Sequence, residues 1–282
     1  MNRLPRLLAL MAFCLAALAG CSGSDDTDTV TTDSTDSITQ LEKDHGGPDG
    51  LRQFFDKSSP EQIQQALAPY GIGYVVHPYQ TEATAEASET AETTGGLAQP
   101  QLISDCVQYF PSADRNIWHN FNGEFYFIDT SGRPSRAYAD LPPIAAAARI
   151  TACQTSIGQW GDAENPSNDY DGGHLIGSQL GGWGGRANIV PQDANFNRGN
   201  WVQLENAMAG CGSLPAGRMR YSITVGYANT TALVPTTFGM VITNQTTSSS
   251  VTMSFTNVDG GGTNGTATRT RGTAFLTSNG CS

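Results

Sequence analysis

The sequence predicts an α+β fold with a central antiparallel sheet, preceded by an export signal and a disordered tether. Near the C-terminus, three runs alternate apolar residues with Ser or Thr, the pattern of half-buried antiparallel strands. Their apolar positions are Tyr221, Ile223 and Val225, then Phe238, Met240 and Ile242, then Val251, Met253 and Phe255. Strand and helix patterns do not alternate along the chain, which disfavours a parallel βαβ sheet.

The first 20 residues have the pattern of a signal peptide. Arg3 and Arg6 precede an apolar run at 7–19 that is too short to span a membrane. The run ends in Leu-Ala-Gly-Cys21, which resembles a bacterial lipobox. The resemblance implies cleavage before Cys21, lipidation of that cysteine and anchoring at the outer membrane, on its periplasmic or cell-surface face. An ordinary secretory signal cleaved nearby is the alternative.

Three further segments precede the main domain. Residues 21–50 are rich in Ser, Thr and Asp and nearly free of apolar side chains, which predicts a disordered acidic tether. Residues 51–80 form a small helix–strand unit of unknown role, with Ser59 and Pro60 at a helix start. Residues 81–100, with Thr, Ala and Glu repeats, form a linker.

Charge divides at the same boundary. Residues 22–100 contain 14 acidic and three basic side chains, whereas residues 101–282 contain 12 acidic side chains and ten arginines. The net charge of −11 therefore comes mainly from the N-terminal segments and does not argue against a polyanionic substrate for the remainder. Arginine also suits phosphate, because its planar fork can bind two oxygens.

The domain at 101–282 is long enough for a single core. Residues 124–129 and 135–138 form strands around a turn at 130–134, and the Ala-rich segment 143–152 forms a short helix. After the three alternating strands, a glycine loop leads to a last strand at 268–277.

The chemically informative stretch lies between residues 170 and 205. His174 follows two glycines, and Asn197 and Glu205 stand eight residues apart. The segment 197–205 has a helical apolar stripe of Trp201, Leu204 and Met208. On a regular helix, Asn197 and Glu205 would lie roughly 80° apart in azimuth, so both could border one site.

These residue types suit a metal-assisted hydrolysis. A neutral oxygen ligand such as Asn197 suits Mg²⁺, which keeps most of its waters, and a neighbouring histidine can act as general base. Taken singly the signals are weak. A Gly-Gly-His segment is usually a loop, and an asparagine at a helix start is usually a cap.

Together, the residues form a recognisable pattern: Asp171-Gly-Gly-His174, then Asn188-Ile-Val-Pro-Gln192, then Asn197 with Leu204-Glu205. The pattern resembles the DNA/RNA non-specific endonucleases of the ββα-metal (His-Me finger) superfamily. The resemblance implies a ββα-metal finger with His174 as general base. It also implies Asn197 as direct ligand of Mg²⁺ (with Mn²⁺ as a substitute) and Glu205 as a residue that holds the metal's waters.

One departure concerns position 172. Relatives carry arginine two residues before the histidine, whereas this chain has Gly172, so a cation expected near the phosphate is missing. Arg198 is the first candidate to replace it, followed by Arg186 and Arg149. Asp171 and Gln192, from the same motif, complete the residues expected on the substrate side.

Four cysteines belong to the domain. Their even number in an exported protein indicates two disulfides, for which three pairings are possible. Cys106–Cys153 with Cys211–Cys281 is preferred, because it ties the entry segment down and holds the C-terminus. Zinc ligation is disfavoured, because no pair has C-x₂-C spacing.

The resemblance implies an endonuclease that hydrolyses DNA and RNA with little sequence preference and leaves 5′-phosphate ends. DNA, RNA and, through the anchor, a membrane are the expected partners, and no protein partner is evident. One alternative is a catalytically inactive lipoprotein that binds nucleic acid at the cell surface. The other is a structural lipoprotein in which the motif occurs by chance.

Overall fold

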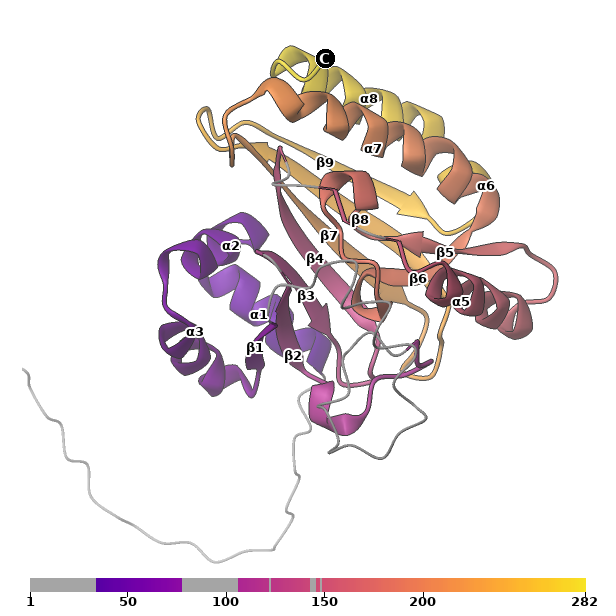
Figure 1. Cartoon of the computed structure of the whole chain (residues 1–282), viewed down its shortest axis with the longest axis horizontal. Coiled ribbons are helices and arrows are strands. Elements are labelled where there is room, and N and C mark those ends of the chain that lie inside the picture. The colour runs from indigo at the N-terminus through magenta and orange to yellow at the C-terminus, as the bar shows by residue number, and fades with distance from the viewer. Residues whose placement is uncertain (1–33, 78–105, 122, 143–145, 148) are drawn as a thin grey trace, which may run out of the picture. The chain divides into compact units, whose positions relative to one another are not determined.

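The computed structural model describes residues 34–77 and 106–282, except residues 122, 143–145 and 148. These residues belong to one compact unit, 33–282 (Figure 1). The expected signal peptide, Cys21 and the linker at 81–100 lie outside the described residues. Within the described ranges, no helix is long and apolar enough to cross a membrane.

A seven-stranded sheet forms the centre, in the order β1-β2-β3-β4-β7-β8-β9. Its strands are β1 Gly73–His77, β2 Ile117–Phe121, β3 Glu124–Ile128, β4 Pro134–Leu141, β7 Met219–Tyr227, β8 Pro235–Asn244 and β9 Ser250–Thr256. β1 pairs with β2 in parallel, and every other pair is antiparallel. The predicted α+β class with an antiparallel sheet is confirmed, and so is the three-stranded meander β7-β8-β9.

The predicted finger is also present. β5 Tyr170–His174 pairs with β6 Ile189–Asp193 in a separate antiparallel sheet. A continuous helical stretch follows, made of α6 Ala194–Phe196, a π-helical turn η6 Asn197–Trp201 and α7 Val202–Ala209. α5 Thr151–Glu164 packs against β5 and β6 (Figure 1).

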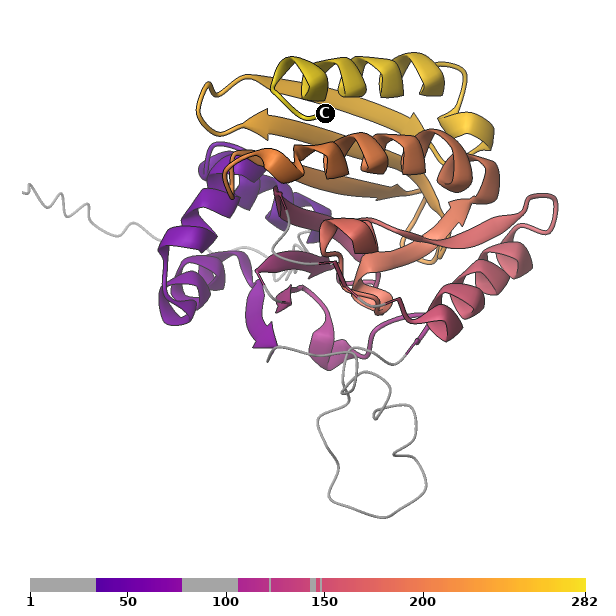
Figure 2. The same cartoon turned by 45° about the horizontal axis from the view of Figure 1, so that its top comes forward.

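Both faces of the central sheet are covered at β2, β3 and β4, whereas β9 has one exposed face. On one face, aromatic side chains of β2, β3 and β4 meet the N-terminal helices α1 Ser34–Asp44, α2 Pro48–Lys57 and α3 Pro60–Leu67. This cluster contains Ile38, Leu41, Leu51, Phe55, Ile63, Leu67, Ile72, Trp118, Phe125, Phe127 and Tyr138. On the other face the main core joins the sheet to the finger, to α7 and to α8 Gly265–Ser278. α7 and α8 lie side by side, and α8 packs on β9 (Figure 2).

Short 3₁₀ turns connect these elements: η1 Ala68–Tyr70, η3 Ser112–Asp114, η4 Ser178–Leu180, η5 Arg186–Asn188, η7 Gly210–Ser213 and η8 Asp259–Gly261. The predicted helix start at Ser59 is confirmed, because its side chain and Gln62 form a capping box. The disulfides Cys106–Cys153 and Cys211–Cys281 are those preferred from the sequence.

The predicted tether was wrong for residues 34–50. α1 and the start of α2 occupy this range, and Ile38 and Leu41 of α1 are 2% and 0% exposed. Two apolar residues one turn apart are enough to pack α1 against the sheet, because the aromatic sheet face supplies the rest of the apolar surface. The described part of the predicted helix–strand unit, residues 51–77, joins the central sheet, since β1 pairs with β2.

Two further element predictions were wrong. The last strand, expected at 268–277, is the helix α8, because its buried residues Gly265, Thr268, Gly272 and Leu276 follow helical spacing. Of the Ala-rich helix expected at 143–152, residues 146, 147, 149 and 150 are not helical and only 151–152 belong to a helix, α5, while 143–145 and 148 lie outside the described residues. Ala147 instead donates its N–H to the carbonyl of Ser178, and α5 begins only at Thr151.

Candidate active site

His174 lies at the end of β5, where two contacts fix its backbone and ring. Its carbonyl oxygen accepts a hydrogen bond of 3.1 Å from the indole Nε1 of Trp201. Its Nδ1 lies 3.4 Å from Nε2 of Gln154 on α5. The side chain is buried, and within the described part of the chain its Nε2 has no hydrogen-bond partner. One imidazole nitrogen is therefore buried with its hydrogen-bonding capacity unused.

The same burial keeps the imidazole neutral. Burial, and to a smaller extent the positive charge of Arg149, lower the pKa of His174 from 6.5 to about 4. A histidine with this pKa is unprotonated at neutral pH, which is the state that a general base requires.

A π-helical turn separates Asn197 from Glu205. The N–H of Val202 donates to the carbonyl of Asn197, five residues earlier, and Gly199 inside the turn has φ −107° and ψ −107°. A π turn inserts one extra residue into a helix. Because the chain is also kinked at Gly199, the azimuth of roughly 80° expected for a regular helix does not apply between these two residues.

Asp171 sets the orientation of the Asn197 amide. A carboxylate only accepts hydrogen bonds, and Oδ2 of Asp171 accepts one of 2.9 Å from Nδ2 of Asn197. The amide oxygen of Asn197 therefore faces away from Asp171, where it can bind a cation. Asp171 also accepts two hydrogen bonds from Arg198, from Nε at 2.8 Å and from Nη2 at 2.6 Å.

Glu205 is buried on α7 against the loop that follows the histidine. A Cβ at Gly177 would lie 2.8 Å from Oε1 of Glu205, so glycine permits this close approach. Oε1 has no hydrogen-bond partner among the described residues. Burial raises the pKa of Glu205 to about 8, while Trp201 and the charge of Arg149 act in the opposite direction.

Arg149 is the cation that the electrostatics associate with both groups, because its charge acts on His174 and on Glu205. Its Nε donates a 2.8 Å hydrogen bond to Oγ of Ser178, which is buried four residues after His174. The Arg149 side chain itself is exposed.

Three residues expected on the substrate side have other surroundings. Arg186 is 0% exposed and donates to the carbonyls of Val107, Gln108 and Ile189, so the expectation that it contacts substrate was wrong. Gln192 is buried on β6 opposite Asp171. Asp171 is a carboxylate and would repel a phosphate, and its contacts give it a positioning role instead.

The missing arginine at position 172 has a steric explanation. A Cβ at Gly172 would lie 2.3 Å from the carbonyl oxygen and 2.6 Å from Cα of Gln154. Gly172 does not have a positive φ, so the requirement for glycine comes from the close approach of α5 and not from a turn.

The donor set fits a hard cation. Within the described ranges, no group of three or more His, Cys, Asp or Glu is placed to bind a metal. The candidate oxygen donors for a cation are instead the amide oxygen of Asn197 and the unpartnered Oε1 of Glu205. Oxygen donors and few protein ligands are the coordination that Mg²⁺ prefers.

Two contributors could not be identified from the sequence. Gln154 lies on α5, and Ser178 lies in η4. Ser178 falls inside the motif, but its bond to Arg149 joins residues 29 positions apart, for which the sequence contains no local signal.

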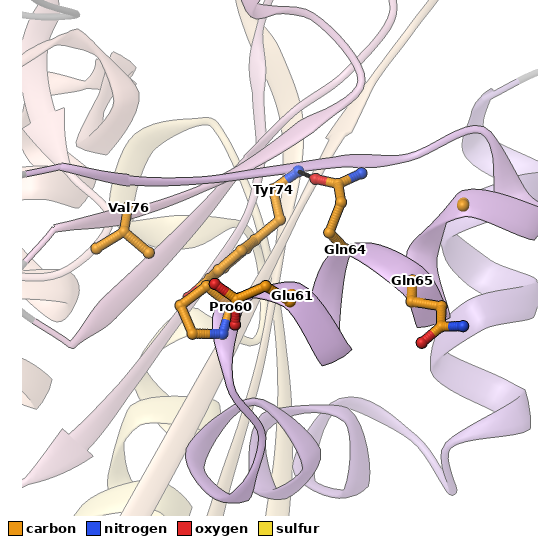
Figure 3. Close-up of a pocket in the computed structure, with 7 residues that line it drawn as sticks. Pro60, Glu61, Gln64, Gln65, Tyr74 and Val76 are labelled. Atoms are coloured by element: carbon orange, nitrogen blue, oxygen red, sulfur yellow. Dashed lines mark hydrogen bonds between the residues drawn. The ribbon is translucent and has the colours of Figure 1, made fainter.

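A groove between α3 and β1 is separate from this site. It is lined by Pro60, Glu61, Gln64, Gln65, Ala68, Tyr74 and Val76 (Figure 3). Gln64 bonds to the backbone of Tyr74 there, and no candidate residue of the finger lines the groove. The groove has no histidine and no cation, so it does not offer the chemistry described above.

Residues 115–246 match the family model described as DNA/RNA non-specific endonuclease. Two solved structures of NucA from Streptococcus agalactiae are also similar to this chain. The structure with no metal bound is 21% identical, with a TM-score of 0.35, and the similarity covers 48% of this chain and 71% of that chain. The structure with a magnesium ion bound is 18% identical, with the same TM-score and coverage. These values are too low to support a functional conclusion, whereas the family match spans all candidate residues of the finger.

Proposed function

We propose that this chain, which carries the domain of a nuclease and hence of a hydrolase, is a Mg²⁺-dependent endonuclease for DNA and RNA. It hydrolyses phosphodiester bonds with little sequence preference and leaves 5′-phosphate ends. One observation supports this assignment most directly. A buried, neutral histidine lies in the same finger as an asparagine whose amide oxygen is turned away from its carboxylate partner.

The chain's own residues supply the nucleophile. The unpartnered nitrogen of His174 accepts a proton from a water molecule that attacks the phosphorus. Trp201 and Gln154 hold His174 in place. The indole of Trp201 donates a 3.1 Å hydrogen bond to the backbone carbonyl of His174, and Nε2 of Gln154 lies 3.4 Å from the ring nitrogen Nδ1. A base fixed in this way needs little reorganisation during the reaction.

Asn197 and Glu205 are the residues that would hold Mg²⁺. When bound, the ion supplies positive charge for the phosphate and for the departing 3′ oxygen. Asp171 keeps the Asn197 amide oriented for this purpose, and Oε1 of Glu205 has no hydrogen-bond partner among the described residues.

The substrate range follows from contacts to the backbone of the nucleic acid. Phosphate and sugar contacts give affinity without reading the sequence. Arginines are the only cationic side chains of residues 101–282, apart from histidine, and suit such contacts.

We also propose that the protein is exported and held at the outer membrane by lipidation of Cys21, which lies outside the described residues. Several acyl chains on one residue hold a protein firmly at a bilayer. Cys21→Ala should release the protein into the soluble fraction without changing its activity. A variant that stays bound to the membrane through alkaline washing would refute the anchor.

Incubation of the purified domain with plasmid DNA and with RNA, in Mg²⁺ and in EDTA, tests the enzymatic proposal. We expect cleavage of both polymers in Mg²⁺ and none in EDTA, and 5′-end labelling after phosphatase treatment should identify the ends. Binding of DNA without cleavage would favour an inactive nucleic-acid-binding lipoprotein, for which Gly172 is the specific argument.

A further inference from the structure

We propose that Arg149 binds the scissile phosphate, in place of the arginine missing at position 172, and that Ser178 positions it. The inference rests on the nuclease function proposed above and assigns a residue of that site. It follows from the contacts of Arg149, from its charge near two site residues and from the surroundings of the competing arginines.

The segment before α5 is fastened to the loop after His174 by two hydrogen bonds. The N–H of Ala147 donates to the carbonyl of Ser178 over 2.9 Å, and Nε of Arg149 donates to Oγ of Ser178 over 2.8 Å. Ser178 is 6% exposed, so it is a fixed acceptor and not a mobile surface hydroxyl. The guanidinium is thereby held through its Nε.

Both terminal nitrogens of Arg149 have no hydrogen-bond partner in the described part of the chain, and the side chain is exposed. A guanidinium held at Nε with its two Nη groups free can donate two parallel hydrogen bonds to the oxygens of a phosphate.

The position of the guanidinium relative to the proposed base and Glu205 follows from its bond to Ser178. Ser178 lies four residues after His174 and directly after Gly177, where an added Cβ would lie 2.8 Å from Oε1 of Glu205. The charge of Arg149 also acts on both His174 and Glu205, which come from different elements of the finger, β5 and α7. A guanidinium held at Ser178 therefore lies beside the loop that runs from the proposed base to the carboxylate of Glu205.

The competing arginines are engaged elsewhere. Arg198 gives two hydrogen bonds to the carboxylate of Asp171, which neutralises its charge and occupies one edge of its fork. Arg186 is 0% exposed and bonded to three carbonyls. An arginine at position 172 is excluded, because its Cβ would lie 2.3 Å from the carbonyl oxygen of Gln154.

The packing of α5 accounts both for the absence of arginine at position 172 and for the presence of Arg149 near the site. α5 packs so closely on β5 that only glycine is accommodated at position 172, and the chain that leads into α5 brings Arg149 to Ser178. The disulfide Cys106–Cys153 joins the first turn of α5 to the entry segment, which holds this arrangement. The cation is therefore supplied from a different segment of the chain.

The test measures cleavage and binding separately. Cleavage is followed as kcat/KM on a short labelled duplex in Mg²⁺. Binding is measured in a His174→Ala background, which leaves the duplex intact, over a series of salt concentrations. The variants are Arg149→Ala, Arg149→Lys and Ser178→Ala, with Arg198→Ala as the competing assignment. Arg271→Ala on α8 serves as a control for loss of one exposed positive charge.

We expect Arg149→Ala to lower kcat/KM by about 10²–10³-fold and to reduce the log–log salt slope of binding by about one unit. Arg149→Lys should restore the slope but only part of the rate, because an ammonium cannot form the bidentate contact. Ser178→Ala should keep the slope and lower the rate about tenfold, the effect of losing one hydrogen bond that orients the guanidinium. Arg271→Ala should leave kcat/KM near that of the parent enzyme.

An Arg149→Ala variant that cuts at the parent rate would overturn the assignment, as would a loss of rate and slope on Arg198→Ala alone. Failure of the parent protein to cut nucleic acid in Mg²⁺ would overturn the proposed function instead, and this inference with it. The two failures are distinguishable, because the first requires an active parent enzyme.

Discussion

The carboxylate of Asp171 accepts a 2.9 Å hydrogen bond from the amide nitrogen of Asn197, across 26 residues of sequence. This contact joins the strand that carries His174 to the helix that carries the proposed metal ligand. Because the carboxylate cannot donate, it determines which end of the amide faces a cation. A residue that orients a ligand in this way affects metal affinity without touching the metal.

Asp171→Ala should therefore raise the Mg²⁺ concentration for half-maximal activity by about 10–100-fold. Asn197→Ala should cause at least as large a shift, since it removes the ligand itself. The measurement is a Mg²⁺ titration of the cleavage rate. Asp259→Ala, at an exposed carboxylate of η8, is the matched control. A titration curve of Asp171→Ala that superimposes on that of the control would exclude the orienting role.

His174→Ala should reduce kcat by about 10²–10⁴-fold, because proton transfer by a positioned base typically contributes that much. The duplex should still bind, and the circular dichroism spectrum should be that of the parent, since Gln154 provides the one side-chain hydrogen-bonding contact of the ring among the described residues. Cleavage by the purified variant at the parent rate would refute the mechanism.

The pH dependence of kcat/KM should follow the lowered pKa of His174. Burial disfavours the imidazolium and lowers the pKa from 6.5 to about 4, so the neutral base persists well below neutral pH. At saturating Mg²⁺, which favours the charged form of Glu205, we expect a nearly constant rate from pH 7 to about 5.5, and a tenfold loss per pH unit once the pH falls below about 4. An acidic limb with a midpoint near the ordinary value of 6.5 would contradict this environment. Circular dichroism at each pH controls for unfolding.

The strands were predictable where one face of the sheet meets solvent. β9 buries Val251, Met253 and Phe255 and exposes the residues between them, so period-two alternation is visible in the sequence. The N-terminal helices were not predictable from the sequence, because the apolar surface that stabilises them belongs to distant strands. Trp118 and Tyr138, for example, pack against Leu41 from another part of the chain.

The last helix illustrates a conflict between local preference and packing. Its threonines favour a strand by propensity, but α8 packs Gly272 so closely on β9 that an added Cβ would lie 2.4 Å from the sulfur of Met253.

The site is likewise divided between features of the local sequence and features of tertiary packing. His174, Asn197 and Glu205 follow from a local motif, whereas the π turn and the contact between Arg149 and Ser178 depend on tertiary packing.

The two disulfides should differ in their effect on activity. They close loops of 47 and 70 residues, so removal of either should cost about 2–5 kcal/mol of unfolding free energy, and the two costs should differ by only about 0.4 kcal/mol. Cys106–Cys153 holds the start of α5, which carries Gln154 next to His174. Cys211–Cys281 joins the end of the α7 region to the C-terminus.

We therefore expect the Cys106→Ser/Cys153→Ser variant to lose activity at a temperature where both double variants are folded. The Cys211→Ser/Cys281→Ser variant should remain close to the parent rate. Urea unfolding establishes the folded range for each variant. An equal loss of activity in both would show that only stability, and not the placement of α5, connects the disulfides to the reaction.

The N-terminal helices should contribute directly to the stability of the nuclease domain through Glu42. Glu42 lies on α1 and is 8% exposed, and its Oε1 accepts a 2.9 Å hydrogen bond from Nε of Arg136 on β4. It also accepts a hydrogen bond from the hydroxyl of Tyr138. Removal of one partner leaves a buried charge uncompensated, which typically costs about 3–5 kcal/mol.

Glu42→Ala should lower the free energy of unfolding by about this amount, measured by urea denaturation of the folded domain. Glu61→Ala is the matched control, because Glu61 is exposed on α3 and accepts a side-chain hydrogen bond from the hydroxyl of Ser59. Its loss should lower the free energy of unfolding far less than the loss of Glu42, because water screens an exposed charge. Equal unfolding free energies for the two variants would mean that α1 is not held to the sheet in solution. Residues 34–50 would then behave as the tether that their composition predicts, and the aromatic face of β2, β3 and β4 would need another cover.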